Sequence, residues 1–283
     1  MNLRLIRKKI RTVSNVKKIT KAMEMISAIK MKKSQNIALD GRPYNDWLKN
    51  IILKVVPNLE NQLSPLLKEP IRTEISKSLS IVISSNKGLC GGFNINLFRF
   101  ISKNTDFKNT DFLIIGKKAS FLSKLGGNII ADFSSPNPLN NVSAIYNFVL
   151  NKYLNENYFE INIFYNKFIS ILKSEPTKTK ILPLKIDFYE RETTVKEYKH
   201  YLIEPSPEKI IDRVLNSYLQ QIIQNAIIES EASEHSSRMM AMKNANENAN
   251  DVIYNLTMLR NKVRQQNITY ELLDMVSAKQ SVE

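Results

Sequence analysis

The chain has 283 residues, of which 43% are hydrophobic and 24% are charged, and it contains a single cysteine. This apolar content is enough for one large globular domain or two ordinary ones, which excludes disordered, collagen-like and disulfide-stapled chains. Cys90 has no second cysteine to pair with, so an internal disulfide and a four-thiolate zinc site are excluded as well. No run reaches the roughly 18 consecutive apolar residues that a membrane span needs, so we expect a soluble chain.

The net charge of +14 is concentrated at the start of the chain. Residues 1–33 contain eleven basic residues and one acidic residue, a net charge of +10, whereas residues 208–283 have a net charge of −2. Such a basic segment predicts an acidic partner, which could be nucleic acid, an anionic lipid surface or another protein. A cleaved organellar transit peptide is an alternative explanation for an Arg-rich, acid-poor opening.

The first segment is predicted to be one long helix, because no Gly or Pro occurs before Gly41. Its apolar residues recur in steps of three and four, which is helical periodicity, with one extra step of three that would be a stammer in a heptad pattern. The stripe consists of Leu3, Ile6, Ile10, Val13, Val16, Ile19, Met23 and Ile26.

The middle of the chain alternates between short apolar runs and helix-like stretches. The runs, rich in Ile and Val, predict strands at 79–84, 111–116, 128–133, 160–166 and 179–186. The helix-like stretches lie at 94–102, 117–125 and 139–155. This alternation predicts an α/β domain with a mostly parallel five-stranded sheet covered on both faces.

The final 76 residues form a second segment without breakers, because no Gly or Pro follows Pro207. The apolar stripe alternates steps of three and four, the 3.5-residue signature of a coiled-coil seam, and includes Ala249, Val252, Leu256, Leu259, Val263, Gln266, Tyr270 and Leu273. A helix of this length would reach about 100 Å. We therefore predict that residues 1–60 and 208–283 form an antiparallel coiled coil and that an α/β domain, residues 72–200, is inserted between them. For the part of the last helix near Pro207, burial of the apolar stripe against the α/β domain explains the stripe equally well.

No enzyme motif is evident. Both nucleotide-binding glycine fingerprints are absent, and His200 and His235 lack partners at metal-ligand spacing. The one concentrated motif is Gly88–Gly92, directly after the first predicted strand, where such folds bind ligands. This loop could cradle a phosphate, or Cys90 could be a low-pKa nucleophile at a helix start. We favour close contact with another backbone or subunit, because glycine permits close approach and a nucleophile needs a base that is missing nearby.

Four segments, in order along nearly the whole chain, closely resemble the gamma subunit of F-type ATP synthases. They are residues 10–35 (IRTVSNVKKITKAMEMISAIKMKKSQ), 88–94 (GLCGGFN), 232–243 (ASEHSSRMMAMK) and 264–272 (RQQNITYEL). The resemblance implies a rotor shaft: an antiparallel coiled coil of both termini with an attached α/β domain. It would couple ion flow through a membrane ring to ATP synthesis by rotating inside a catalytic hexamer.

The implied chain is a non-catalytic subunit without a cofactor or metal. Its implied partners are the alpha and beta subunits of the hexamer, the epsilon subunit and the proteolipid c-ring, with no nucleic acid. Membrane contact would occur only through the complex, on the cytoplasmic face of a bacterial inner membrane or, as an alternative, the inner face of an organelle membrane.

The resemblance also assigns roles to particular residues. Those implied to contact the catalytic ring are Met23, Lys18, Lys21, Arg238, Gln265 and Thr269. An apolar sleeve would surround Leu272, Leu273, Met275 and Val276. A loop contact is implied for Gly88, Leu89, Cys90, Gly91 and Gly92. The foot, facing the proteolipid ring, would include Arg42, Pro43, Tyr44 and Tyr201. Basic residues of the first helix would face acidic loops of the catalytic subunits, although a solvated helix face is the simpler explanation for any one lysine.

A basic coiled-coil protein that binds nucleic acid is the alternative function. It is weakened by the lack of aromatic residues among the N-terminal lysines, where single-strand binders place them for stacking.

Overall fold

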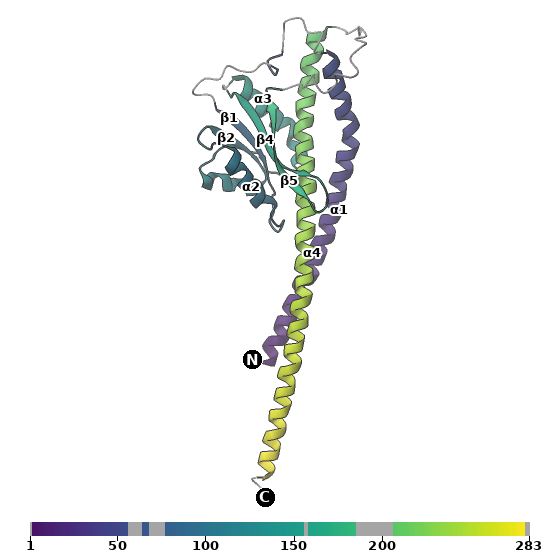
Figure 1. The fold of residues 1–283 in the computed structure, drawn as a ribbon, viewed down its shortest axis with the longest axis vertical. Coiled ribbons are helices and arrows are strands. Elements are labelled where there is room, and N and C mark those ends of the chain that lie inside the picture. Colours follow the sequence, from purple (N-terminus) through teal and green to yellow (C-terminus); the bar gives the residue numbers. More distant parts are fainter. Residues whose placement is uncertain (1, 56–63, 68–76, 156–157, 185–205, 281–283) are drawn as a thin grey trace. The chain divides into compact units, whose positions relative to one another are not determined.

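A computed structural model of the chain describes residues 2–55, 64–67, 77–155, 158–184 and 206–280. Two long helices, α1 (Leu3–Val55) and α4 (Pro207–Gln280), flank an α/β domain in sequence (Figure 1). The chain divides into two compact units: residues 29–237 form one, and residues 1–28 together with 238–283 form the other. Among the described helices, none is long and apolar enough to cross a membrane.

The larger unit is built on a five-stranded sheet with strand order β3-β2-β1-β4-β5. The first four strands in this order are parallel, and β5 pairs antiparallel with β4 at the edge. The strands are β1 (Ser78–Ile83), β2 (Thr110–Ile115), β3 (Asn128–Asp132), β4 (Glu160–Phe168) and β5 (Ser174–Leu182). The predicted mostly parallel sheet of five strands is confirmed.

One face of the sheet holds the main core. Leu79, Ile81 and Ile83 of β1 point to this face together with alternate residues of β2 and β4, because successive side chains of a strand point to opposite faces. They pack against α3 (Val142–Asn155) and against the parts of α1 and α4 that belong to this unit. The contributing residues of these two helices are Ile52, Val55, Ile211, Leu215, Leu219, Ile223, Ala226 and Ile227.

The other face is covered by α2 (Phe93–Asn104) and the 3₁₀ helix η2 (Lys117–Leu125). Val82, Phe112 and Phe164, which alternate with the residues of the first face, pack there against Leu97 and Leu122. Since both faces are covered, the central strands read as continuous apolar runs, which is why the sequence reveals them.

In the smaller unit, the beginning of α1 lies alongside the C-terminal part of α4 (Figure 1). Ile6 is fully buried, and Met242 and Ala249 on α4 are also buried. Leu256, Leu259 and Val263 are half-buried, but Val252 is exposed. Every residue from Arg264 to Ala278 is exposed, so the predicted seam of α4 is covered by this chain only as far as Val263.

After Val13, three of the four residues of the predicted α1 stripe are uncovered, and only Met23 is half-buried. Val16, Ile19 and Ile26 are exposed, whereas Thr20 and Ser27 are buried. The covered positions keep a regular alternation of three and four, continuing from Val13 through Lys17, Thr20, Glu24 and Ser27. The residues of a seam must all face the partner helix, so their average spacing has to stay at 3.5 residues. In α1 this spacing, and not apolar character, decides which residues are covered, and no stammer is present.

Candidate functional sites

The loop Gly88–Gly92, called the glycine loop below, follows β1 at the carboxyl edge of the sheet and leads into α2. Asn94 holds it from inside: the Asn94 Nδ2 donates to Ser85 Oγ (2.8 Å) and to Cys90 Sγ (3.3 Å), and its Oδ1 accepts from the Ser85 backbone N–H (3.2 Å). The Ser85 hydroxyl donates to the Lys87 carbonyl (2.8 Å). The loop is therefore fixed by polar groups on either side of it, from the residues after β1 and from the first turn of α2.

The tip of the glycine loop exposes a leucine. Leu89 has a φ of 62°, a left-handed conformation that is uncommon for a residue other than glycine, and 65% of its surface is exposed. Gly91 also has a positive φ of 57°. Cys90, between them, is buried and points inward. This arrangement presents an apolar side chain to another protein and covers the thiol, which favours the contact interpretation over a Cys90 nucleophile.

The ligand position of a doubly wound sheet is occupied by the chain itself. The strand order reverses between β1 and β4, and ligands in such folds bind at the carboxyl edge beside this point. Asn166 of β4 lies there, buried, and its Nδ2 donates to the carbonyl of Phe93 at the start of α2 (3.2 Å). Ser233 of α4 donates its hydroxyl hydrogen to the Asn166 carbonyl (2.9 Å).

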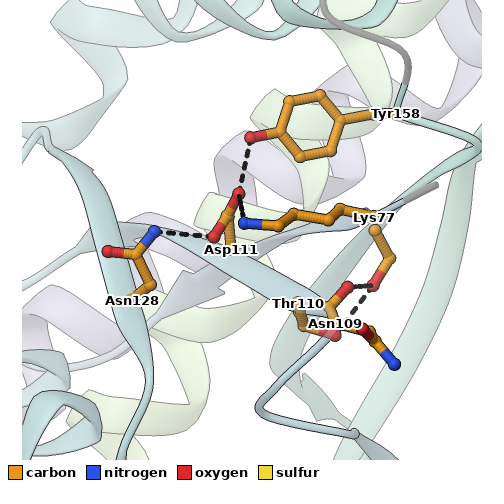
Figure 2. A network of polar contacts seen from close by, with 7 residues as sticks. Lys77, Asn109, Thr110, Asp111, Asn128 and Tyr158 are labelled. Atoms are coloured by element: carbon orange, nitrogen blue, oxygen red, sulfur yellow. Dashed lines mark hydrogen bonds and ion pairs between the residues drawn. The ribbon is translucent and has the colours of Figure 1, made fainter. Parts of the chain in front are cut away.

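A buried carboxylate lies at the opposite, amino edge of the sheet (Figure 2). Asp111 accepts hydrogen bonds from Asn128 Nδ2 (2.7 Å) and the Tyr158 hydroxyl (2.8 Å), and Lys77 Nζ lies 3.5 Å from its Oδ2. Burial alone would raise the pKa of Asp111, but these donors and the lysine charge outweigh it, so its pKa lies below the ordinary value. Because the amino edge is not where ligands bind in this fold class, the network indicates a structural role.

Two partly buried carboxylates lie on α4 in the larger unit. Burial raises the pKa of Glu229, although Lys167, Arg42 and a hydrogen bond from Tyr165 oppose this shift. Burial also raises the pKa of Glu231, with a further contribution from Glu234, against the charges of Lys30 and Lys33. Basic residues of α1 and β4 therefore compensate part of the cost of burying these acids.

Most of the N-terminal basic residues are exposed. Lys18 is exposed. Lys21 is exposed as well, and it forms an ion pair with Glu24 one turn along the same helix (Nζ to Oε1, 2.9 Å). Pairs of this kind contribute only a few tenths of a kcal/mol, about 0.2–0.5. The exposed ammonium groups are accessible to another molecule, and their contact with an acidic partner stays a prediction.

An apolar row is exposed at the surface of α1. In the smaller unit it comprises Val16, Ile19 and Ile26, which the sequence analysis assigned to the seam, together with Met25, which it did not; all four are 49–60% exposed. The exposed end of α4 adds the four residues of the predicted sleeve contact, Leu272, Leu273, Met275 and Val276. These surfaces have the character of an interface with another protein.

The other predicted coupling residues differ in accessibility. Gln265 and Thr269 are exposed on neighbouring turns, where the Thr269 hydroxyl donates to the Gln265 carbonyl (2.9 Å). Met23 is half-buried and Arg238 is buried. The burial of Arg238 favours a role in holding the chain's own structure over a direct contact with the ring.

The predicted foot residues Arg42, Pro43 and Tyr44 are all exposed on α1, and Tyr201 lies outside the described residues. Sequence reasoning missed Trp47, the only tryptophan of the chain, which is 69% exposed three residues after Tyr44. Ile51 follows at the next turn and is also exposed. The i, i+3, i+7 spacing of Tyr44, Trp47 and Ile51 places them on one helix face, and this signal was available in the sequence.

No group of three or more His, Cys, Asp or Glu side chains suited to a metal ion occurs among the described residues. His235 is half-buried on α4, and His200 lies outside the described part of the chain.

Comparisons with known proteins find one family across the whole chain. The sequence profile of a family described as ATP synthase matches residues 2–282. ATP synthase gamma chains of Methylacidiphilum infernorum and Glaesserella parasuis are 35% and 36% identical, over 97% and 96% of both chains respectively. The gamma chain of Akkermansia muciniphila is 31% identical over 100% of this chain and 99% of its own length.

Solved structures share the fold. The rotor of the Euglena gracilis mitochondrial ATP synthase aligns with a TM-score of 0.62 at 17% identity, covering 94% of this chain and 98% of that one. A chain of the central stalk and c-ring of the Tetrahymena thermophila mitochondrial ATP synthase aligns with a TM-score of 0.56 at 24% identity, covering 80% and 99%.

Proposed function

We propose a rotor function for this chain, which belongs to the family of ATP synthase gamma chains. It is the central stalk of an F-type ATP synthase and couples ion flow through a membrane ring to ATP synthesis by turning inside the catalytic hexamer. The observation that carries this proposal is the full-length match to gamma chains, joined to two long helices with apolar surfaces left uncovered. The comparisons give the nucleic-acid alternative no support.

A rotor acts by binding chemically identical subunits differently. A ligand with equal affinity for two conformations shifts neither, so a symmetric rod could not distinguish three catalytic sites. The two helices of this chain present different surfaces, one basic and one apolar at its exposed end. The angle of the shaft and the nucleotide affinity of each site are then linked reciprocally: ion flow drives ATP release, and ATP hydrolysis drives the reverse rotation.

The exposed end of α4 is the bearing. Leu272, Leu273, Met275 and Val276 have no covering partner in the described chain, and an apolar sleeve of the hexamer would bury them. Hydrophobic burial is non-directional, so such a contact resists rotation less than a ring of hydrogen bonds would. Gln265 and Thr269, one or two turns earlier, are exposed and available for the directional contacts that transmit force.

Lysines on α1 supply the complementary electrostatic contact. Lys18 and Lys21 lie among the eleven basic residues of the first 33, and acidic loops of the beta subunits are their proposed partners. Each exposed pair contributes about 0–1 kcal/mol, so the effect comes from the number of charges. Met23 is the proposed apolar contact within this basic surface.

The foot includes Arg42, Pro43 and Tyr44, to which we add the exposed Trp47. Tyr and Trp are enriched in the centres of protein interfaces, where they bury large surfaces. We assign this face to the proteolipid c-ring and the epsilon subunit. The chain itself catalyses no reaction, and the complex lies on the cytoplasmic face of a bacterial inner membrane, in keeping with its bacterial relatives.

The proposal is tested by isolating the tagged chain from native membranes under mild detergent. We expect nucleotide-binding alpha and beta subunits to co-purify, with a native mass that corresponds to one copy of this chain per hexamer. A chain that is recovered without these subunits, or with nucleic acid that 0.5 M salt displaces, would refute the rotor.

A further inference from the structure

A continuous line of buried hydrogen bonds connects α4 to the glycine loop. Ser233 Oγ on α4 donates to the carbonyl of Asn166 on β4 (2.9 Å), and Asn166 Nδ2 donates to the carbonyl of Phe93 (3.2 Å). The Phe93 N–H in turn donates to the carbonyl of Cys90 within the loop (3.2 Å). Ser233, Asn166, Phe93 and Cys90, called the relay below, belong to the same compact unit.

Water does not compete with these bonds. The exposed fractions of Ser233, Asn166, Phe93 and Cys90 are 0%, 2%, 3% and 3%. A buried donor or acceptor that loses its partner is not rehydrated, so each bond resists breaking more strongly than a surface bond would. The relay is thus a stiff connection across the carboxyl edge of the sheet.

Asn166 is the central member of the relay because it forms one bond through its backbone and another through its side chain. Its amide is the only one of the four side chains that reaches from the sheet to α2 within the relay. Ser236, one turn after Ser233, donates to the Ile171 carbonyl beyond the end of β4, which adds a second bond between α4 and the same hairpin. The hairpin of β4 and β5 is therefore anchored to α4 at two points.

We propose that Asn166 is a positioning residue that makes the glycine loop and α4 move as one body. The inference rests on the proposed rotor function, in which α4 belongs to the shaft, and on the contact with a neighbouring subunit that the exposed Leu89 favours for the glycine loop. A force on the exposed Leu89 side chain passes through Cys90, Phe93 and Asn166 to Ser233, rather than bending the loop. The position where nucleotide-binding folds hold a ligand is filled here by a stiff connection between the glycine loop and α4.

Cys90 provides a direct readout, because it is the only cysteine of the chain and is buried inside the loop. The full chain is treated with N-ethylmaleimide at constant pH, and the rate of Cys90 alkylation reports how often the loop opens. We expect Ser233→Ala and Asn166→Ala each to raise this rate about fivefold, the effect of losing one net hydrogen bond. The double variant should react no faster than Asn166→Ala alone, because both substitutions break the same connection.

Ser230→Ala is the matched control: Ser230 lies on the same helix, is 2% exposed, and does not belong to the relay. Its alkylation rate should equal that of the wild type. Urea unfolding of each variant, followed by circular dichroism, shows how much of any change comes from global unfolding. The proposal is overturned if Ser233→Ala accelerates alkylation no more than Ser230→Ala does, or only in proportion to the loss of global stability.

A second experiment uses the assembled complex. With Ser233→Ala, we expect ATP hydrolysis to continue while the number of ions pumped per ATP falls, whereas Ser230→Ala leaves the ratio unchanged. If Ser233→Ala leaves the number of ions pumped per ATP unchanged, the proposed mechanical role of the relay is refuted. Failure of the wild-type chain to assemble would refute the rotor function, but the alkylation rates would still decide whether the relay positions the loop.

Discussion

The polar residues at the two edges of the sheet differ in charge: a carboxylate, Asp111, lies at the amino edge and neutral amides lie at the carboxyl edge. At the amino edge, three donors converge on one buried carboxylate and fix the starts of β1, β2 and β3 together with Tyr158, which lies two positions before β4. At the carboxyl edge, Asn94 and Asn166 use neutral amides to hold a loop that has an exposed tip. The charged side chain lies at the edge where folds of this class do not bind ligands, and the amides lie at the edge that bears the proposed contact.

Replacing Asp111 by Asn should lower the free energy of unfolding at pH 7 by about 2 kcal/mol, because the Asn128, Tyr158 and Lys77 donors lose their charged acceptor. The pKa of Asp111 is lower in the folded chain than its ordinary value of 3.8. Its stabilising contribution is therefore complete above that value and is lost as the pH falls through the folded pKa. Urea unfolding at pH 7 and near pH 2 should show the variant and wild type converging at the lower pH.

Asp212→Asn, at an exposed position of α4, is the control for this measurement and should change stability by less than about 0.5 kcal/mol. A loss for Asp111→Asn that is equally large at both pH values would mean that the carboxylate charge is not the source of the stabilisation.

None of these residue-level sites could be predicted from the sequence alone. Asn166 and Phe93 are 73 positions apart, and Asp111 and Tyr158 are 47 positions apart. Asn and Tyr are common residue types, and only the strand order β2-β1-β4 brings these pairs together. The motif containing Cys90 was visible because three glycines in five residues are unusual, whereas its supports carry no local signal.

At the scale of single elements, α1 shows where a hydrophobic pattern misleads. Thr20 and Ser27 are buried in the seam, and their hydroxyls donate to carbonyls of the same helix, Lys17 at 3.0 Å and Met23 at 2.7 Å. A hydroxyl that is satisfied within its own helix can be buried without a partner across the seam. The apolar residues nearby are then released to face outward, which a pattern search for buried apolar residues cannot detect.

Two isoleucines of α1 provide a test of this register. Ile6→Ala should lower the free energy of unfolding by about 2–4 kcal/mol, because Ile6 is fully buried. Ile19→Ala should change it by less than about 0.5 kcal/mol, because Ile19 is 60% exposed, yet it should weaken binding to the catalytic ring. Urea unfolding and co-purification measure the two effects, and similar losses of stability for both variants would contradict the register.

The strand β5 illustrates a smaller error of the same kind. The predicted strand began at Thr179, whereas β5 begins at Ser174. Its first residues, Ser-Glu-Pro-Thr-Lys-Thr-Lys, are polar because β5 is an edge strand with one neighbour, and Pro176 is tolerated there. An edge strand lacks the continuous apolar run that makes a central strand recognisable.

At the scale of the whole molecule, the distribution of glycine and proline was the most informative feature of the sequence. It predicted two long helices on either side of an α/β domain, because these two residues interrupt helices and all of them lie between Gly41 and Pro207. One exception is instructive: α1 continues through Gly41 and Pro43 to Val55. Packing of Ile52 and Val55 against the sheet core stabilises the helix beyond these breakers.

Deleting residues 267–283 should leave the thermal unfolding of the remaining chain unchanged, because the described residues from Arg264 onward are exposed. In the complex, the same deletion should weaken the coupling of ATP synthesis to ion flow without abolishing it, since the sleeve contact is distributed over several apolar residues. Calorimetry of the chain and ATP synthesis in membrane vesicles measure the two outcomes.

Leu272→Ser combined with Met275→Ser is the companion variant, because it keeps the length of α4 and removes only apolar surface. It should reproduce part of the coupling defect. A truncated chain that unfolds at a markedly lower temperature would show that the end of α4 supports the fold, contrary to its exposure.

The uncovered apolar side chains on α1 and at the end of α4 also affect how much of this chain a cell can make relative to its partners. Val16, Ile19 and Ile26, together with Leu272 and Met275, are in contact with water until partner subunits arrive. Exposed apolar surface of this kind promotes self-association. Any molecule made in excess of its partners is therefore a substrate for chaperones and proteases, and the supply of this subunit has to be matched to that of the ring that encloses it.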